Sequence, residues 1–353
     1  MNAIPKTTRA AVYENGGRVV VRDVALQPPA RGELLVRVSA CGLCASEALA
    51  WYADSKAPFV LGHEPVAEIV ACGEGASPAE GAPFVAGERV FVHHHAPCMT
   101  CRRCHRGDYV QCTTWRSTRL NPGALAQFAT VPADNVRHDV LRIPPQVSDD
   151  QATLVEPLAT VVKSVRRSGL RKDDRVLVLG LGAMGMLHAL VARERGAALI
   201  IGADRVKSRL DRAKQFGIGV AMDVDVAPLR DQVHAATAGE GAEIVFVTPG
   251  SRAALEAAAT CVAPGGSIVA FTPLAPGEAW PVDVNDLFFK DVSIVMSYSA
   301  GPNDTREALE LLSSGLPVEP LFTHRFGLDQ AAAAYAMVKN PEAGLKVIVY
   351  PNQ

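Results

Sequence analysis

The sequence has almost no net charge and no long uninterrupted apolar run. Its 37 acidic and 35 basic residues leave a formal net charge of −2, so we expect no general attraction for nucleic acid or anionic lipid. The longest uncharged stretch, residues 176–192, contains three glycines and falls short of the roughly 18 apolar residues that suggest a membrane span. No long apolar run follows the charges near the N-terminus, so no secretion signal is expected. These absences predict a soluble, cytoplasmic protein.

The chain also has no internal repeat at a fixed period and no low-complexity segment. Its apolar content of 48% is sufficient for a full hydrophobic core and excludes a disordered chain. A length of 353 residues exceeds the roughly 100 to 200 residues of a usual domain. We therefore expect two domains.

The two parts of the chain differ in texture. Up to about residue 150, short β-type runs are broken by Gly and Pro, which predicts a mostly β domain with long loops. From Leu158, apolar runs without polar alternation alternate with helix-like stretches, which is typical of a doubly wound α/β domain with a parallel sheet. Predicted strands are 18–24, 33–40, 65–72, 89–92, 126–131, 175–179, 198–202, 244–247, 267–271 and 346–350, and predicted helices are 184–195, 207–216, 251–261, 303–314 and 328–339.

A glycine-rich segment, RVLVLGLGAMGMLHALVA, lies between a predicted strand and a predicted helix. In that context the G-x-G-x-x-G spacing of Gly180, Gly182 and Gly185 is a dinucleotide fingerprint. The glycines permit a tight turn, close approach of the pyrophosphate and close packing of helix on strand. With Ala183 and Met184, they begin a helix whose amides would bind the phosphates. A packed turn without a ligand is the alternative interpretation.

The cofactor preference depends on the end of the next predicted strand, ALIIGADR. Asp204 ends it, where an acidic side chain can accept hydrogen bonds from the adenosine ribose and repel the extra phosphate of NADP. Arg205 and Arg209 weaken this preference for NAD, because a guanidinium group can neutralise that phosphate or merely stack on adenine. We expect NAD, with NADP less favoured.

Four cysteines crowd into one loop with the spacing C-x2-C-x2-C-x7-C. Four thiolates complete a tetrahedral zinc shell and leave no open position, so this zinc is expected to be structural. We expect Arg102, Arg103 and Arg106 to favour the thiolate form. An iron–sulfur cluster and disulfides are the alternatives. The predicted ligands are Cys98, Cys101, Cys104 and Cys112, and the neighbouring His93, His94, His95 and His105 are interpreted mostly as loop or core residues.

A second set of potential ligands is dispersed along the chain. Cys44 lies in CGLCASE, His63 and Glu64 lie in VLGHEP, and Glu156 lies in LVEPLAT. Cys, His and a carboxylate are the mixed ligands of a zinc that keeps an open position for substrate. Each residue alone has an ordinary core or capping interpretation, but together with a dinucleotide domain they indicate a catalytic zinc.

With these motifs in this order, the chain resembles the zinc-dependent medium-chain dehydrogenases/reductases, the family of alcohol, sorbitol and threonine dehydrogenases, over essentially its full length. The matching motifs are GLCASE, GHE, the four-cysteine loop, LVEPLAT and GLGAMG. The resemblance implies a GroES-like, mostly β catalytic domain of residues 1–157 and 298–353, to which the C-terminal tail returns. It also implies a Rossmann NAD-binding domain of residues 158–297, an active site between the domains, and a homodimer or homotetramer.

The resemblance also assigns roles to individual residues. Cys44 and His63 correspond to ligands of the catalytic zinc, with Glu64 and Glu156 as alternating or water-mediated carboxylate partners. Ser46 corresponds to the hydroxyl that passes the substrate proton onward.

Two positions depart from the family pattern. Glu47 stands where the family usually has the Asp that orients the zinc-bound His, and a longer carboxylate must be accommodated differently. Leu49 stands where many alcohol dehydrogenases carry a His that hands the proton to solvent. Proton exit is then left to cofactor hydroxyls, to water, or to an imidazole among residues 93–95.

The combination of sites predicts a reaction class. Zinc lowers the pKa of a hydroxyl that it binds, and a nicotinamide accepts hydride, so we expect reversible oxidation of an alcohol to a carbonyl. A polyol, sugar, cyclitol or other secondary alcohol is the predicted substrate, and an amino alcohol such as threonine is the alternative. A hydrolytic zinc enzyme would leave the nucleotide fingerprint unused, and the intact ligand set disfavours a non-catalytic zinc scaffold.

Other residues carry weaker expectations. Five residues lie on segments that could line the substrate cleft, namely Trp51, Trp115, Arg116, Arg119 and Tyr298. The alternative is that the tryptophans pack in the core or in a dimer contact and that the arginines are solvated. Cys41, Cys72 and Cys261 are expected to be small buried residues, and His188 a packing residue of the cofactor helix.

Overall fold

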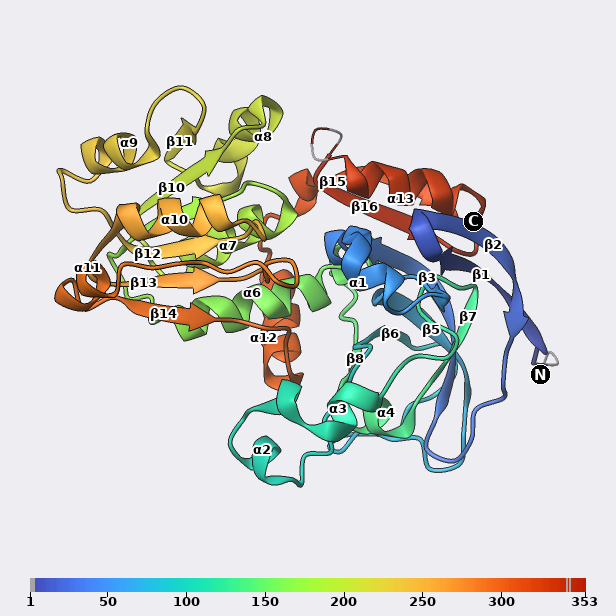
Figure 1. The fold of residues 1–353 in the computed structure, drawn as a ribbon. Coiled ribbons are helices and arrows are strands. Elements are labelled where there is room, and N and C mark those ends of the chain that lie inside the picture. Colours follow the sequence, from blue (N-terminus) through green and yellow to red (C-terminus); the bar gives the residue numbers. More distant parts are fainter. Residues whose placement is uncertain (1–3, 341, 343) are drawn as a thin grey trace. The chain divides into compact units, whose positions relative to one another are not determined.

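The computed structural model describes residues 4–340, 342 and 344–353 (Figure 1). The chain divides into two compact units, of which unit 1 comprises Met1–Ala159 and Ala300–Gln353 and unit 2 comprises Thr160–Ser299. The division falls within helix α6 (Val155–Ser168). Among the described residues, no helix combines the length and the hydropathy that crossing a membrane requires.

Unit 1 is mostly β. One sheet has the strand order β2-β1-β4, and a larger one has the order β15-β16-β3-β5-β6-β8, with β7 also paired to β3. The strands are β1 (Thr7–Glu14), β2 (Arg18–Ala25), β3 (Leu34–Leu43), β4 (Phe59–Val60), β5 (Glu64–Cys72), β6 (Arg89–Val92), β7 (Phe128–Val131), β8 (Val140–Arg142), β15 (Phe322–Gly327) and β16 (Lys346–Tyr350). The helices are α1 (Ala50–Asp54), α2 (Arg102–His105), α3 (Thr113–Ser117), α4 (Ala133–His138), α5 (Asp149–Ala152), α12 (Pro302–Ser313) and α13 (Ala331–Lys339).

Strand β3 is the centre of the unit 1 core. It is buried along nearly its whole length, because β5, β7 and β16 pair with it and α13 packs nearby. Its β-branched and leucine side chains suit this covered position. Strand β16 runs antiparallel to β3, with Val347 opposite Leu43. The C-terminal strand thus belongs to the same sheet as β3 and β5.

Unit 2 is a parallel sheet with the strand order β11-β10-β9-β12-β13-β14. Helix α7 contacts β9 and β10, and α10 contacts β12 and β13. The chain order reverses between β9 and β12, and in such sheets nucleotides bind beyond the carboxyl ends of the strands at this switch point. The strands are β9 (Arg175–Leu179), β10 (Leu199–Asp204), β11 (Val220–Asp223), β12 (Ala242–Val247), β13 (Val262–Ala270) and β14 (Ser293–Met296), and the helices are α7 (Ala183–Glu194), α8 (Lys207–Arg212), α9 (Leu229–Ala236), α10 (Arg252–Cys261) and α11 (Val284–Phe289).

The predicted fold class, with a mostly β part and a doubly wound parallel-sheet part, is confirmed. Local differences have physical causes. The helix predicted over 207–216 tightens after α8 into a 3₁₀ turn, Ala213–Phe216, which ends at Gly217 with φ +78°, a left-handed conformation that favours glycine. The helix predicted over 328–339 likewise begins with a 3₁₀ turn, Leu328–Gln330. Strand β13 begins at Val262, earlier than predicted, and its pairing with β12 is irregular between Val262 and Ser267.

Candidate metal centres and nucleotide loop

The four-cysteine loop folds so that its sulfurs converge. Cys101 Sγ lies 3.5 Å from Cys104 Sγ, and Cys112 Sγ lies 3.6 Å from Cys98 Sγ. Four sulfurs bound to one zinc at about 2.3 Å would be about 3.8 Å apart, whereas a disulfide needs about 2.05 Å. The described cysteines are all free thiols. The arrangement therefore fits a tetrahedral metal ion, and the disulfide alternative is not the one this structure adopts.

The thiol of Cys98 is the one most clearly tuned toward the thiolate. Hydrogen bonds from the Thr100 hydroxyl, which lies 3.5 Å from Cys98 Sγ, and then from the Thr100 amide, lower the pKa of Cys98 to about 6. We expected guanidinium groups to favour the thiolate form, but two of them form hydrogen bonds with other groups. Arg103 donates to the Gln111 carbonyl at 2.6 Å, and Arg106 donates to Asp108 at 3.0 Å. Our expectation for these two arginines was wrong, because charged side chains on an exposed loop reach the nearest oxygens instead.

A second group of ligand atoms belongs to Cys44, His63 and Glu64, which all lie within 4.8 Å of one another. Cys44 directly follows β3, and Glu64 begins β5. The antiparallel register places Gly42 opposite Glu64 and so brings the two strand ends together. A side chain at Gly42 would lie only 2.0 Å from Glu64 Oε2, so this approach requires a glycine.

Glu47 holds the ring of His63. The His63 Nδ1–H donates to Glu47 Oε1 at 2.9 Å, and the same oxygen accepts the amide of Gly62 at 2.9 Å. Burial lowers the pKa of His63, but the Glu47 carboxylate and Cys44 outweigh it and raise the pKa well above its usual value. The glutamate side chain at position 47, which is longer than the aspartate usual in the family, therefore still reaches the His63 imidazole. This hydrogen bond leaves Nε2 of His63 available for a metal. The hydroxyl of Ser46 donates to Cys44 Sγ at 3.2 Å.

Lys346 is a site residue that sequence reasoning missed. Its side chain is almost wholly buried, its ammonium contacts Glu64 Oε2, and it also donates to the Leu43 carbonyl at 3.2 Å. Burial alone would lower the pKa of Lys346, yet the Glu64 carboxylate outweighs it and raises the pKa. The only sequence signal was a lysine on the same face of a predicted strand as the buried Ile348.

Glu156 belongs to a third group. It lies in the first turn of α6, and its carboxylate gathers with ring nitrogens of His93 and His94 within 4.8 Å. Burial raises the pKa of Glu156. Sequence analysis assigned this residue to Cys44 and His63 and interpreted the histidines as loop or core residues, so this grouping was not anticipated.

The remaining histidines and aromatic residues of unit 1 take various positions. The ring of His95 packs against Trp115 at 4.1 Å between centroids with the ring planes tilted by 36°, and its Nδ1 lies 2.8 Å from the Arg119 guanidinium. Trp115 is therefore a buried packing residue, whereas Trp51 and His105 are exposed. In unit 2, Tyr298 is exposed. Of the three cysteines without a motif, Cys41 and Cys261 are buried as expected, but Cys72 is exposed at the end of β5, so that prediction was wrong.

The glycine loop of unit 2 follows β9 and begins α7. Gly180 has φ +83°, and a side chain there would lie 2.6 Å from Thr248 Oγ1. A side chain at Gly185 would lie 1.9 Å from the carbonyl oxygen of Gly180. Both glycines are thus required by the turn and by the close packing of helix on strand. Gly182 caps α7 at Ala183, where the first-turn amides, including that of Met184, lack helical partners.

Asp204 has internal partners in addition to any cofactor. Its carboxylate accepts the amides of Leu181 at 2.6 Å, Arg205 at 2.7 Å and Val206 at 2.9 Å. Arg209 Nη1 lies 3.3 Å from the same carboxylate, and its guanidinium is the nearest group to the open side of Gly182. Asp204 therefore supports the glycine loop, and Arg209 stands beside it as a cation.

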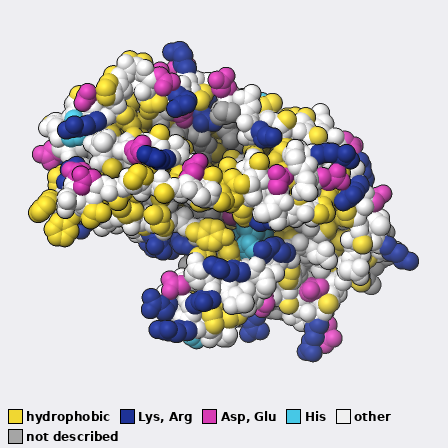
Figure 2. All heavy atoms as spheres, viewed as in Figure 1, with side chains coloured by type: hydrophobic (Ala, Val, Ile, Leu, Met, Phe, Trp, Pro, Cys, Tyr) yellow, Lys and Arg dark blue, Asp and Glu magenta, His cyan; other side chains and the backbone are white. Residues whose placement is uncertain are grey.

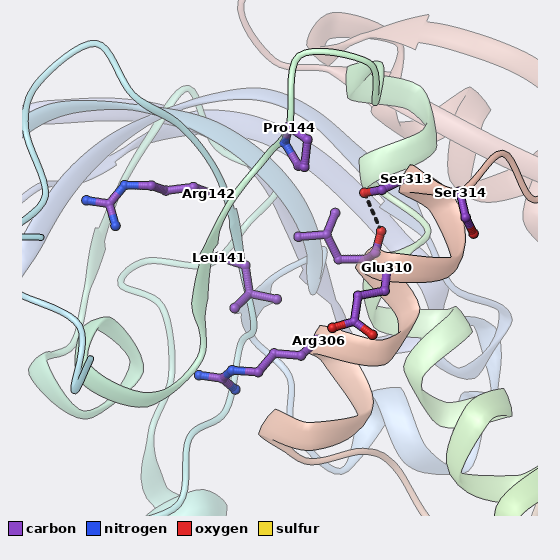
Figure 3. A pocket seen from close by; sticks show the side chains of 8 residues that line it. Leu141, Arg142, Pro144, Arg306, Glu310, Ser313 and Ser314 are labelled. Atoms are coloured by element: carbon purple, nitrogen blue, oxygen red, sulfur yellow. Dashed lines mark hydrogen bonds between the residues drawn. The ribbon is translucent and has the colours of Figure 1, made fainter. Parts of the chain in front are cut away.

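A pocket of about 510 Å³ also lies in unit 1 (Figure 3). Arg142 is held by Glu88, and Arg306 by the His138 carbonyl. None of the described residues that line this pocket belongs to the candidate metal centres or to the glycine loop. Its lining consists of Leu141, Arg142, Pro144, Arg306, Leu309, Glu310, Ser313 and Ser314.

Comparison with known proteins identifies the family. Residues 30–145 match the alcohol dehydrogenase GroES-like domain, and residues 183–314 match the zinc-binding dehydrogenase domain. L-threonine 3-dehydrogenase of Coxiella burnetii (strain Dugway 5J108-111) is 30% identical over 329 residues, which cover 91% of this chain and 92% of that protein. The chain belongs to the zinc-dependent medium-chain dehydrogenase family. Sorbitol dehydrogenase of Bacillus subtilis (strain 168) is 27% identical over 365 residues, covering 100% of this chain and 99% of that protein.

Solved structures of dehydrogenases share the fold. The rspB alcohol dehydrogenase of Escherichia coli CFT073, in complex with NADH, has a TM-score of 0.87 and 27% identity over 98% of this chain and 100% of that one. A zinc-binding dehydrogenase structure from Sinorhizobium meliloti 1021, bound to NADP, has a TM-score of 0.85 and 25% identity over 98% and 100% of the two chains. Membership of this zinc-dependent dehydrogenase family confirms the predicted fold, the predicted family and the prediction of an oxidoreductase.

Proposed function

We propose that this dehydrogenase oxidises a secondary alcohol of the polyol, sugar or cyclitol type, with NAD as the hydride acceptor. The alcohol loses a hydride to NAD⁺ and a proton to the protein or solvent, so that the products are a carbonyl compound, NADH and H⁺. The observation that carries the proposal is the convergence of Cys44, His63 and Glu64, a mixed ligand set typical of a zinc that keeps an open position.

Each residue of that group has a proposed task. Cys44, His63 and Glu64 would hold the ion, and Glu47 orients His63 through the 2.9 Å hydrogen bond. Zinc bound there would supply Lewis acidity that brings the pKa of a hydroxyl toward neutrality. The hydroxyl of Ser46, 3.2 Å from Cys44 Sγ, is the group that we assign to pass the substrate proton onward. Four thiolates, Cys98, Cys101, Cys104 and Cys112, would hold a structural zinc.

We propose that the glycine loop binds NAD in preference to NADP. The amides at the start of α7 would receive the pyrophosphate beside Gly182. The carboxylate of Asp204 disfavours a further phosphate, although Arg209 at 3.3 Å offsets part of its charge. An exposed Arg205 lies next in the chain. Relatives bound to NADH and to NADP are both known, so the preference depends on this local balance of charge.

An amino alcohol is the second candidate substrate. Threonine dehydrogenases are among the relatives at 30% identity, alongside sorbitol dehydrogenases at 27%. Both substrate classes present a secondary hydroxyl for oxidation, and they differ in the charge that the substrate carries beside it. A test must therefore include neutral polyols and charged amino alcohols.

We also propose that the chain forms a homo-oligomer and acts in the cytoplasm without nucleic-acid or membrane partners. Apolar side chains gather over α11 in the space-filling view (Figure 2), and Phe288 and Phe289 are 72% and 84% exposed. Met296 on the edge strand β14 is 60% exposed. Large apolar surfaces of this kind mark protein contacts. The free thiols are consistent with a reducing compartment.

The decisive experiment measures formation of NADH or NADPH with a panel of polyols, sugars, sugar phosphates and amino alcohols. We expect turnover with a polyol or sugar and NAD, and its loss in the Cys44→Ser variant. Cys41→Ser is a control, because Cys41 is a buried thiol outside the ligand group. A zinc-loaded protein that transfers no hydride from any alcohol would contradict the proposal and favour a non-catalytic scaffold.

A further inference from the structure

Arg119, which follows α3, is a cation that the chemistry assigned above does not use. We propose that its guanidinium group binds an anionic substituent of the substrate, a carboxylate or a phosphate, while the hydroxyl to be oxidised occupies the open position of the ion held by the Cys44 group. Guanidinium groups match the geometry of both anions. The substrate is then an anionic derivative of a polyol or sugar, such as a sugar acid or a sugar phosphate. This inference rests on the proposed function and makes it more specific.

A row of imidazole rings connects Arg119 with the Cys44 group. The rings of His63 and His94 are 5.0 Å apart between centroids, and those of His94 and His95 are 4.1 Å apart. Arg119 Nη1 lies 2.8 Å from Nδ1 of His95. The guanidinium group therefore lies near the region that a sugar-sized substrate would occupy with its hydroxyl at the ion.

Both ends of this row are open to solvent. Arg119 is exposed, His94 is half-buried, and the side chain of His63 keeps 18% of its exposure. Cys44 is half-buried as well. A polar substrate can thus approach the candidate ligands and the guanidinium group without first opening the core of unit 1.

Backbone contacts hold the guanidinium group in place. Nη1 of Arg119 donates to the carbonyl oxygens of Thr118 at 2.6 Å and of Arg116 at 2.9 Å. Burial, followed by the charge of Arg119, lowers the pKa of His95 to about 2, so this imidazole stays neutral. These three acceptors therefore position the cation without carrying a negative charge themselves. A side chain that is already positioned loses less entropy when it binds an anion.

The neighbouring Arg116 provides a comparison. It is also exposed, but its guanidinium group donates to the Gln111 side chain and to the Val110 carbonyl. Both of these partners belong to the four-cysteine loop. The sequence gave the two arginines equal standing as substrate contacts, and their hydrogen bonds assign that role to Arg119.

The test compares kcat/KM for anionic and neutral alcohols that share one carbon skeleton. Sorbitol is the neutral probe, and gluconate and sorbitol 6-phosphate carry a carboxylate and a phosphate. We expect the wild type to prefer one of the anionic probes, and Arg119→Gln to lower the anionic-to-neutral ratio roughly ten- to hundredfold, as loss of a charge-assisted hydrogen bond implies. Arg119→Lys should keep part of the preference, because it retains the charge but not the planar group. Arg116→Gln is the matched control.

A binding measurement tests the subsite without turnover. Gluconate and sorbitol 6-phosphate are titrated calorimetrically into the zinc-loaded protein saturated with NADH, which cannot accept a hydride. We expect the affinity for the preferred anionic probe to fall at least about tenfold in Arg119→Gln and to stay the same in Arg116→Gln. Circular dichroism establishes that each variant is folded.

The outcomes separate this inference from the proposed function. Equal ratios and equal affinities in the wild type and in folded Arg119→Gln would overturn the inference and leave oxidation of a neutral polyol standing. A wild type that prefers sorbitol to both anionic probes would also overturn it. Loss of anion binding in Arg119→Gln, in a protein that oxidises no alcohol, would support the subsite and contradict the proposed function.

Discussion

The ammonium group of Lys346 lies against the carboxylate of Glu64, and both side chains are buried in unit 1. A buried ion pair adds little net stability, but removal of one partner leaves an uncompensated charge and costs about 3–5 kcal/mol. This pair therefore holds one oxygen of Glu64 and leaves Oε1, which has no hydrogen-bond partner among the described residues, for a metal.

We predict that Lys346→Met lowers the free energy of unfolding by about 3–5 kcal/mol, and that addition of Glu64→Gln restores part of the loss. Urea denaturation of the zinc-depleted protein measures both. The control is Lys290→Met, which breaks the exposed pair with Asp286 and should cost under about 1 kcal/mol. Equal effects of the two lysine substitutions would contradict a buried role for Lys346.

We predict that Gly42→Ala displaces the same pair, because the added carbon would lie 2.0 Å from Glu64 Oε2 and 2.9 Å from Lys346 Cε. Overpacking of this kind costs about 1–3 kcal/mol, and zinc affinity at the Cys44 group should fall with it. Gly219→Ala is the control, since its nearest contact would be an ordinary 3.6 Å. Unchanged metal affinity in folded Gly42→Ala would count against the assigned role of Glu64.

We predict that His188 makes unit 2 sensitive to acid. Its buried ring packs on Phe246 and Phe271, Nδ1 donates to the Met184 carbonyl at 2.7 Å, and Nε2 accepts from Ser164 at 3.0 Å. This role as a packing residue matches the sequence prediction. Burial lowers the pKa of His188 to about 4, from an unfolded value of 6.5.

The sign of the effect follows from those pKa values. Because the folded pKa is depressed, the stabilisation is complete above pH 6.5 and is lost as the pH falls toward 4, by up to about 3 kcal/mol. Urea unfolding of wild type and His188→Gln at several pH values between 7 and 4 measures it. The variant should show a flatter dependence, and parallel curves would refute the assignment.

We predict that Cys104→Ser removes one zinc and destabilises the loop around it. Among the described residues, the local hydrophobic cluster has four buried members, two of which are cysteines, so we expect the ion to provide much of the stability. Structural zinc contributes on the order of 10 kcal/mol in isolated zinc-finger peptides. Thermal unfolding with metal analysis is the readout, and Cys72→Ser, at an exposed thiol, should change neither.

We predict that Asp204→Asn raises the NADP/NAD ratio of kcat/KM by roughly tenfold, about 1.4 kcal/mol of discrimination. The amide oxygen can still accept from Arg205 and Val206, while the negative charge is lost. The exposed Asp211 on α8 provides the control Asp211→Asn. A ratio that does not change, or that falls, would show that Asp204 serves only the loop.

The sequence predicted what short spacings encode. The residues of the four-cysteine loop and of the glycine fingerprint are close together in the sequence, so the function of each motif could be predicted before the fold was known. The role of Lys346 could not be predicted, because its partner Glu64 is 282 residues away in the sequence. Their ion pair depends on the register of β16 with β3. The grouping of Glu156 with His93 likewise depends on where α6 begins relative to the end of β6.

The register of β16 with β3 has a consequence for biosynthesis. Cys44, His63 and Glu64 leave the ribosome long before Lys346 does, so a nascent chain that ends ahead of β16 carries Glu64 without its counter-ion. Stop codons or proteolytic cuts before that strand should therefore yield species that chaperones and proteases recognise as unfinished, although they retain all three of those ligands.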